Sequence, residues 1–371
     1  MTLPENGTDT PSLTPLLTPG ELKRAAPANA EANAAVSAAR SAARAILRRH
    51  DDRLLVVVGP CSIHDPEAAL EYAALLRTAR QELGSHLEIV MRVYFSKPRT
   101  TVGWKGLMHD PDLDGSGGLN RGLRKTRELL AAVNGMGVPA ATEYLDTVAP
   151  VFLGDLISWA AIGARTAESQ VHRELASGAG CPVGFKNGTT GDVQAALHGI
   201  EAAANRHQVV SIGDDGRAAI AETPGNPDCH LILRGGVEPN YDAASVNAAC
   251  LAAENAGQSC AVMVDTSHAN SRKKPENQPA VAAAVAGQVA AGDHRIIGVM
   301  IESNLVAGQQ SIDAKPLRYG QSVTDGCVDW QTTEEMLLDL ANAVSLRRQS
   351  GQRRHEQPSA SQFRAEQRLA V

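Results

Sequence analysis

Short apolar runs alternate with helical stretches eight times along this 371-residue chain, and this alternation constrains the fold more than any other feature. The runs are rich in β-branched residues and bounded by Gly, Pro or polar residues, as is typical of strands buried on both faces. Strands that alternate with helices in this way predict an α/β protein with a closed (β/α)8 TIM barrel. The expected strands span residues 54–58, 88–94, 139–143, 156–164, 182–186, 230–233, 261–264 and 296–301.

Several segments fall outside this repeat, and one expected strand is ambiguous. Trp159 and several alanines leave a helix as the alternative for 156–164. A turn at Asp214-Asp215-Gly216 predicts a β-hairpin, and a capping box of Thr332 and Glu335 predicts the start of the last helix. The expected organisation is a flexible N-terminal arm (1–30), one barrel domain (31–348) that contains the inserted hairpin (207–222), and a disordered polar tail (349–371).

Charge and hydropathy exclude several classes of partner. The formal net charge of -6 argues against a nucleic-acid partner. No run of 18 apolar residues and no signal peptide is present, so we expect neither a membrane partner nor export, and a cytoplasmic protein. Because the cysteines lack CxxC spacing, a disulfide framework is not expected; they are Cys61, Cys181, Cys229, Cys250, Cys260 and Cys327.

Chemically active residues follow the apolar runs. The carboxyl ends of barrel strands gather at one rim, where such proteins place their catalytic groups. Each residue has an ordinary alternative, such as a packed core thiol for Cys61 or a salt bridge for a cation. Their coincidence after eight runs favours a common site, formed by Cys61, Arg92, Lys97, Glu143, Arg165, Lys186, Arg234, His268 and Glu302.

The stretch 89–101 ends its strand in a group of anion-binding residues. Pro98 cannot continue a strand, so Arg99, Thr100 and Thr101 are expected on a loop. Guanidinium, ammonium and hydroxyl groups together suit a phosphate. A solvated charged loop is the alternative, but the other strand ends carry similar residues, which favours the phosphate site.

The rim residues divide into two chemical sets. Cys61, His268, Glu302 and Asp325 offer a thiolate, an imidazole and two carboxylates, which suit a divalent transition metal such as Mn, Fe, Co or Zn. The other set is cationic, and two close cations repel by about 4 kcal/mol at an effective dielectric of about 20. Anionic, phosphorylated ligands would compensate the charge of Arg92, Lys97, Arg165, Lys186 and Arg234.

These residues lie in motifs that closely resemble those of the type I 3-deoxy-D-arabino-heptulosonate 7-phosphate (DAHP) synthases. The similarity extends from about residue 14 to about residue 347. Its motifs are Gly-Pro-Cys-Ser-Ile-His-Asp-Pro (59–66), Lys-Pro-Arg-Thr-Thr (97–101), Ile-Gly-Ala-Arg-Thr (162–166) followed by Glu-Ser-Gln-Val-His-Arg-Glu (168–174), Gly-Phe-Lys-Asn-Gly (184–188), Leu-Arg-Gly-Gly (233–236), Ser-His-Ala-Asn (267–270) and Glu-Ser (302–303).

The resemblance implies condensation of phosphoenolpyruvate with erythrose 4-phosphate, the first step of the shikimate pathway. It implies that Arg99 and Thr100 bind the sugar phosphate, that Lys97 is an acid towards the aldehyde and that Glu143 orients water. Phosphoenolpyruvate would be held by Arg92, Lys97, Arg165, Lys186, Arg234 and His268. One divalent metal ion, Mn²⁺ first among the candidates, would be held by Cys61, His268, Glu302 and Asp325.

Two other functions remain open. One is condensation with arabinose 5-phosphate to 3-deoxy-D-manno-octulosonate 8-phosphate by a related barrel, whose loop resembles Lys-Ala-Asn-Arg-Ser-Ser rather than the Lys-Pro-Arg-Thr-Thr of residues 97–101. The other is a catalytically silent regulatory barrel, although no expected catalytic position is substituted. The resemblance favours the four-carbon sugar.

Regulation and assembly are also implied by the resemblance. Family members usually bind an aromatic amino acid near Pro150, Cys181 and the hairpin with Ser211, and the arm of a neighbouring subunit completes that site. We therefore expect a homodimer or homotetramer. Ala179-Gly180 replaces a bulkier pair found in many relatives, so the effector is not readable. Because Cys327 lies close in sequence to Asp325, loss of metal could also permit an inactivating disulfide with Cys61.

Overall fold

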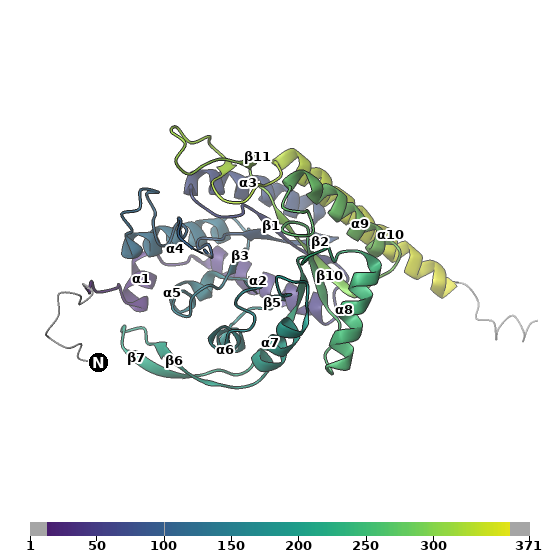
Figure 1. Cartoon of the computed structure of the whole chain (residues 1–371), viewed down its shortest axis with the longest axis horizontal. Helices are drawn as coiled ribbons and strands as arrows, with labels where there is room; N and C mark the ends of the chain where they lie inside the picture. The colour runs from purple at the N-terminus through teal and green to yellow at the C-terminus, as the bar shows by residue number, and fades with distance from the viewer. Residues whose placement is uncertain (1–12, 100, 357–371) are drawn as a thin grey trace, which may run out of the picture.

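A closed barrel of eight parallel strands forms the centre of the protein (Figure 1). The computed structural model describes residues 13–99 and 101–356. All eight predicted runs are strands, including the ambiguous 156–164, which contains β4. They are β1 (Leu54–Gly59), β2 (Leu87–Arg92), β3 (Ala140–Glu143), β4 (Trp159–Ile162), β5 (Val183–Lys186), β8 (Cys229–Leu233), β9 (Val262–Asp265) and β10 (Ile296–Glu302).

The order of the strands around the barrel brings the predicted rim residues to one end. The order is β1-β10-β9-β8-β5-β4-β3-β2, so β1 and β10, the first and last barrel strands along the chain, are neighbours. Gly59 is paired with Glu302, and Met300 is paired with Asp265. Because all of these pairs are parallel, Cys61, which follows β1, lies beside the end of β10. The expected (β/α)8 barrel is confirmed.

Helices surround this barrel on the outside. Asp65 caps the helix after β1 as the sequence predicts, since its Oδ1 accepts the Glu67 N–H at 2.9 Å. The helices are α2 (Ala30–Leu47), α3 (Pro66–Leu83), α4 (Leu119–Gly135), α5 (Ala149–Leu153), α6 (Gln170–Gly178), α7 (Gln194–Ala204), α8 (Ala243–Asn255), α9 (Gln278–Ala290) and α10 (Trp330–Glu356), with the short 3-10 turns η1 (Gly154–Leu156) and η2 (Pro275–Asn277). Among the described helices, none combines the length and the apolar composition that a membrane span requires.

The start of the last helix differs from the prediction. The expected capping box of Thr332 and Glu335 does not open it, because α10 already begins at Trp330. Asp329 accepts the Thr332 N–H at 2.9 Å and therefore acts as the cap. The helix also continues to Glu356, past the expected boundary at 348, and the remainder of the predicted tail (357–371) lies outside the described residues.

The predicted arm and hairpin contact each other. Within the predicted arm, the structure contains a helix, α1 (Pro19–Ala25), whose Leu22 is fully buried. The hairpin is β6 (Gln208–Ile212) paired antiparallel with β7 (Ala218–Glu222). In Figure 1 the turn of the hairpin lies close to α1. Lys23 Nζ of α1 is 2.8 Å from Asp214 Oδ1 of the turn. Residues 1–12 lie outside the described part of the chain. A short pair that the sequence did not predict, β11 (Val306–Gln309) and β12 (Gln321–Ser322), follows β10.

The helix α2 closes the N-terminal end of the barrel. Ala43 and Ile46 of α2 belong to the same buried cluster as the inward-facing Leu55, Val57 and Trp159. Arginines of α2 and of the turn after it bond to the segments that start the strands. Arg40 donates to Ile157 O (2.9 Å), Arg44 and Arg48 to the Asp228 carboxylate (3.0 and 2.8 Å), and Arg49 to Cys260 O (2.9 Å). The barrel interior is therefore closed from this end.

A neutral histidine inside the barrel makes stability depend on pH. His230 is buried, its Nε2 accepts the Trp159 indole N–H at 3.3 Å, and burial lowers its pKa to about 4. In the unfolded chain this ring titrates near pH ~6.5. Between these two values the unfolded state binds more protons, so stability is lost as the pH falls from about 6.5 to about 4.

Replacing His230 with Gln should reduce this loss. A Gln amide keeps an acceptor for Trp159 and does not titrate. The decrease in unfolding free energy from pH 7 to pH 4 should be smaller by about 3 kcal/mol in His230→Gln than in the wild type, as measured by urea denaturation at each pH. Stability near pH 7 provides the control. Parallel pH profiles of the two proteins would contradict the assignment.

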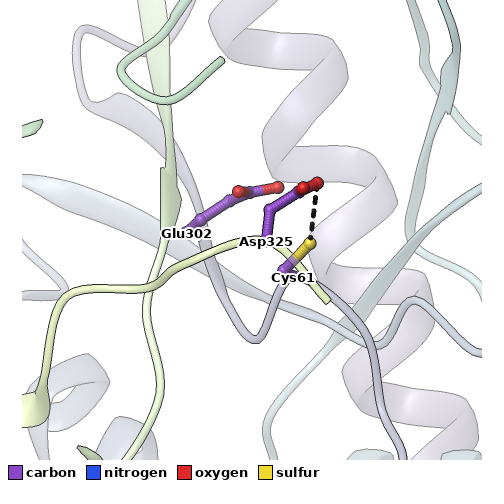
Figure 2. A group of neighbouring side chains, drawn as sticks. All are labelled: Cys61, Glu302 and Asp325. Carbon is purple, nitrogen blue, oxygen red and sulfur yellow. Dashed lines mark hydrogen bonds between the residues drawn. The ribbon is translucent and has the colours of Figure 1, made fainter. Parts of the chain in front are cut away.

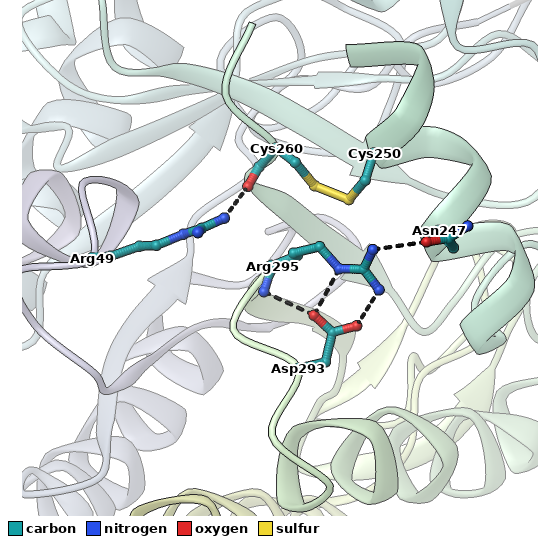
Figure 3. Close-up of a disulfide and its surroundings, with 6 residues drawn as sticks. All are labelled: Arg49, Asn247, Cys250, Cys260, Asp293 and Arg295. Carbon is teal, nitrogen blue, oxygen red and sulfur yellow. Dashed lines mark hydrogen bonds and ion pairs between the residues drawn. A yellow bond between two sulfur atoms is a disulfide. The ribbon is translucent and has the colours of Figure 1, made fainter. Parts of the chain in front are cut away.

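A disulfide joins Cys250 on α8 to Cys260, just before β9 (Figure 3). The sequence did not predict this pair, because a separation of 10 residues fits no cysteine motif. Their Cα atoms are 5.0 Å apart, within the range that a disulfide spans. The disulfide ties the middle of α8 to the segment that leads into β9, the strand that ends in Asp265.

Reduction of this disulfide should destabilise the protein. Closing so short a loop limits the unfolded chain, and losing the constraint costs about 2 kcal/mol. The reduced wild type and Cys250→Ser should melt at the same temperature, several degrees below the oxidised wild type. Alkylation followed by mass spectrometry checks the redox state. Cys181→Ser, which leaves the pair intact, should still respond to reductant; a Cys250→Ser variant that also responds would contradict this prediction.

Candidate active site

Three of the predicted metal ligands lie together at the carboxyl end of the barrel. Potential ligand atoms of Cys61, Glu302 and Asp325 all lie within 4.8 Å of one another (Figure 2). Cys61 follows β1, Glu302 ends β10, and Asp325 lies on the loop before α10. The Cys61 Sγ is 3.5 Å from Asp325 Oδ2. We refer to these three residues as the donor group.

The chemistry of the donor group fits a divalent cation. Burial, together with Glu302 and Asp325, raises the pKa of the Cys61 thiol to about 11. A bound cation would compensate both carboxylates and favour the thiolate, and a mixed sulfur and oxygen shell suits metals of borderline softness. Cys61 and Glu302 are buried, whereas the Asp325 side chain is 72% exposed, so the group is open towards solvent on one side.

His268, the fourth predicted ligand, is not part of the donor group in the structure. It follows β9 and adopts a left-handed backbone conformation with φ of 56°. Its Nδ1 lies 3.0 Å from Asp265 Oδ2 and 2.6 Å from Ser267 Oγ. His268 still lies near enough to Asp325 to help lower the pKa of that carboxyl, against the effect of burial. The imidazole therefore borders the donor group, with Nδ1 already bonded.

Arg92 joins the donor group to the cationic set. This arginine is fully buried, its Nη2 is 3.0 Å from Glu302 Oε1 and its Nε is 3.3 Å from Pro60 O. The guanidinium lies over the Tyr94 ring, 3.8 Å from the ring centre. Its buried Nη1 bonds to no atom of the described residues. An unpartnered, buried guanidinium nitrogen at the mouth of the barrel is suited to bind an anionic ligand.

Lys97 contacts the donor group directly. Its Nζ lies 3.0 Å from Cys61 Sγ and 3.9 Å from Asp325 Oδ2. Burial alone would lower the pKa of Lys97, but Cys61, Glu302 and Asp325 together raise it. The lysine is therefore a protonated ammonium, and it can donate a hydrogen bond or a proton at the donor group.

The remaining cations occupy different depths. Lys186 ends β5 and is buried, with its Nζ 3.1 Å from Asp265 Oδ2. Arg165 is exposed on the loop after β4, and Arg234 is half-buried after β8. Arg99 is exposed on the loop after β2, where its Nε donates to Trp104 O at 2.7 Å. Thr100 lies outside the described residues.

Glu143 ends β3 and packs against a glycine. A Cβ atom on Gly163 would lie 2.4 Å from Glu143 Oε1, so the carboxylate occupies space that only glycine leaves open. Glu143 also contributes to the raised pKa of Tyr94, although burial of that phenol is the larger cause. Glu143 is therefore at the rim, as predicted.

Two residues near the site were missed in the sequence. Asp265 ends β9 and is fully buried, yet it is absent from the predicted rim residues. An acid at the end of an otherwise apolar run was the available signal. Tyr94 falls within the expected strand 88–94 but follows β2 in the structure, and its spacing from Arg92 does not indicate their stacking.

The most pronounced cavities among the described residues do not coincide with this site. Two of them, with volumes of about 420 and 500 Å³, lie at the opposite end of the barrel. They share Cys229 and Cys260, which precede or start β8 and β9, and no proposed ligand of the site lines them. Charged side chains also line the second of these cavities, but they lie at the end of the barrel where the strands start, whereas the donor group and its cations follow the carboxyl ends, where barrel enzymes place their catalytic groups.

Fold and site together define a class of protein: a (β/α)8 barrel with a thiol and carboxylate donor group beside buried cations. The chain matches the DAHP synthetase I family over residues 29–338. On this evidence, the chain belongs to that family.

Individual relatives agree with this assignment. The Phe-sensitive phospho-2-dehydro-3-deoxyheptonate aldolase of Escherichia coli (strain K12) is 55% identical over 334 residues, covering 90% of this chain and 95% of that protein. The Tyr-sensitive protein of the same strain is 50% identical over 327 residues, covering 88% and 92%. The structure of the phospho-2-dehydro-3-deoxyheptonate aldolase from Francisella tularensis SCHU S4 is similar with a TM-score of 0.90 and 47% identity, covering 91% of this chain and 99% of that chain.

Proposed function

We propose that this chain condenses phosphoenolpyruvate with D-erythrose 4-phosphate to give DAHP and phosphate, the first step of the shikimate pathway. The observation that carries the proposal is the direct bonding of the donor group to buried cations. Arg92 bonds to Glu302 and Lys97 bonds to Cys61, so one site would hold an ion beside an anionic substrate. The names of the relatives support the same reaction.

Phosphoenolpyruvate would occupy the deeper, cationic part of the site. Arg92 and Lys186 are buried there, and the charge of this substrate would compensate them. The exposed Arg99, with Thr100, would bind the phosphate of the sugar nearer to solvent. The full proposed set for phosphoenolpyruvate is Arg92, Lys97, Arg165, Lys186, Arg234 and His268.

One divalent ion would be held by Cys61, Glu302 and Asp325, with His268 completing the shell. When bound, it would supply Lewis-acid polarisation of the aldehyde carbonyl. Mn²⁺ is our first candidate, and Fe²⁺, Co²⁺ and Zn²⁺ suit the same ligands. Removal of this ion is expected to stop turnover.

The chain's own residues would direct the bonds and protons. The aldehyde is held so that C3 of phosphoenolpyruvate attacks its carbonyl carbon, and Lys97 donates a proton to the developing alkoxide. Glu143 orients a water molecule that adds at C2 and releases one proton to the solvent. The resulting hemiketal then loses phosphate, and its C2 becomes the keto carbon of the product.

Loss of phosphoenolpyruvate in the presence of each sugar tests this proposal. We expect turnover with erythrose 4-phosphate, little with arabinose 5-phosphate, and none after treatment with a chelator. Preference for the five-carbon sugar would instead support the octulosonate reaction. No turnover with any sugar and any of the four metals would support a silent barrel.

An oligomer regulated by an aromatic amino acid is the accompanying proposal. The hairpin presents Val210 and Ile220, paired across its two strands and largely exposed, as expected for a surface that a second subunit covers. The relatives are named Phe-sensitive and Tyr-sensitive, so an aromatic effector is proposed without choosing between them. A monomer in light scattering would contradict the homodimer or homotetramer. The cytoplasmic location and the disulfide between Cys61 and Cys327 also stay predictions.

A further inference from the structure

Asp265 bonds to both halves of the proposed site through a single oxygen atom. Its Oδ2 lies 3.1 Å from Lys186 Nζ and 3.0 Å from His268 Nδ1. The other oxygen, Oδ1, accepts the N–H and the hydroxyl of Ser267 at 3.0 and 2.7 Å. One carboxylate thus contacts a cation assigned to phosphoenolpyruvate and an imidazole assigned to the metal.

The carboxylate is held firmly in this position. Asp265 is fully buried, and its own carbonyl oxygen accepts the Asn270 side-chain amide at 2.8 Å. Burial alone would raise the pKa of Asp265, but the Lys186 ammonium and the His268 ring hold it well below the usual range. A buried carboxylate with no freedom to move must share its charge between its two partners on Oδ2.

We propose that Asp265 is a positioning residue that couples metal binding to phosphoenolpyruvate binding. The proposal rests on the function proposed above. By accepting the Nδ1 proton of His268, Asp265 fixes the tautomer in which Nε2 carries the lone pair that a metal requires. The same oxygen also accepts a hydrogen bond from the Lys186 ammonium. An anionic substrate must compete with Asp265 for this ammonium.

The shared oxygen sets the sign of the coupling. A cation bound at Nε2 would make the Nδ1–H group of His268 a stronger hydrogen-bond donor. The bond from His268 to Asp265 Oδ2 would then strengthen, and the bond from Lys186 to the same oxygen would weaken. Lys186 is then less strongly held and binds an anion more readily. The metal therefore raises the affinity for phosphoenolpyruvate, and linkage requires that phosphoenolpyruvate raise the affinity for the metal by the same factor.

Binding measurements without the sugar test this inference, because no turnover is then needed. Calorimetry gives the Kd of phosphoenolpyruvate with and without Mn²⁺, and electron paramagnetic resonance gives the Kd of Mn²⁺ with and without phosphoenolpyruvate. For the wild type we expect each ligand to tighten the other about tenfold. For Asp265→Asn we expect that factor to fall to about one and the Mn²⁺ affinity to fall about 10- to 100-fold.

Two further variants keep the test decisive. Asp293→Asn removes a carboxylate that pairs with Arg295 at the other end of the barrel (2.8 Å), and it should keep the wild-type coupling. Ser267→Ala leaves the charge of Asp265 in place but removes a hydrogen bond to Oδ1 and the contact of Ser267 Oγ with His268 Nδ1. This variant should therefore bind both ligands with a coupling factor reduced about threefold. This variant carries the test if Asp265→Asn does not fold.

The outcomes separate this inference from the proposed function. Wild-type coupling in Asp265→Asn, or in Ser267→Ala when Asp265→Asn does not fold, would overturn the positioning role. Independent binding of Mn²⁺ and phosphoenolpyruvate to the wild type would also overturn it, while leaving the condensation reaction in place. Failure of the wild type to bind phosphoenolpyruvate under any condition would instead overturn the proposed function.

Discussion

Replacing Arg92 with Leu is expected to weaken phosphoenolpyruvate binding by about 100-fold or more and to destabilise the protein. The guanidinium donates charge-assisted bonds, and each such bond contributes about 1.5–3 kcal/mol. The variant also leaves the buried carboxylate of Glu302 without its partner at 3.0 Å. Breaking a buried ion pair from one side costs about 3–5 kcal/mol. Calorimetry measures the first effect, and urea denaturation measures the second.

The double variant Arg92→Leu with Glu302→Gln separates these two effects. Removing the charge of Glu302 as well should restore most of the lost stability, because no unpaired buried charge remains. Phosphoenolpyruvate binding should stay weak, since the guanidinium is still missing. If the single variant unfolds at the wild-type urea concentration, the buried pair does not stabilise the native state as we describe.

Replacing Cys61 with Ala is expected to lower turnover by about 1,000-fold. The thiol lies between Lys97 and Asp325, so the variant loses both the soft ligand of the donor group and the acceptor of the Lys97 ammonium. Loss of Lewis-acid stabilisation worth several kcal/mol corresponds to a factor of this size. Steady-state kinetics with saturating Mn²⁺ measures the effect.

Cys327 offers a matched control for that experiment. It is a buried thiol close to Cys61, but it does not belong to the donor group. Cys327→Ala removes a similar volume from the same region and should retain most of the activity. Equal losses in the two variants would mean that packing near the mouth, rather than metal ligation by Cys61, determines the rate.

Most of the barrel could be predicted because the signal is local. A strand such as Leu54–Gly59 is apolar along its whole length. The start of a helix such as α3 is indicated by the N-cap Asp65 and by Pro66 at its first position. The same locality explains the errors. The sequence predicts Thr332 as the N-cap of α10, but the structure has Asp329 in that role. Both residue types fit an N-cap, and the packing of the first turn decides between them.

The composition of the site was predicted better than its geometry. Cys61, Glu302 and Lys97 follow or end barrel strands, so the backbone alone places them at one rim. In the structure the side chains of Glu302 and Lys97 both lie close to Cys61. The orientation of His268 depends on a left-handed backbone and on Asp265, which are set by contacts between neighbouring strands. Such contacts leave no periodic pattern in a single sequence, so the role of Asp265 could not be predicted.

The closure of the barrel floor by α2 has a consequence for the order of events in catalysis. Because Ala43 and Ile46 pack into the barrel interior, ligands can enter and leave the barrel only at the rim formed by the carboxyl ends of the strands. Arg92 is fully buried, whereas Arg99 is exposed on the loop after β2. A ligand bound at the buried Arg92 would have to enter before a ligand bound at the exposed Arg99. If the proposed reaction takes place at this rim, ordered binding with phosphoenolpyruvate first is the expected kinetic scheme.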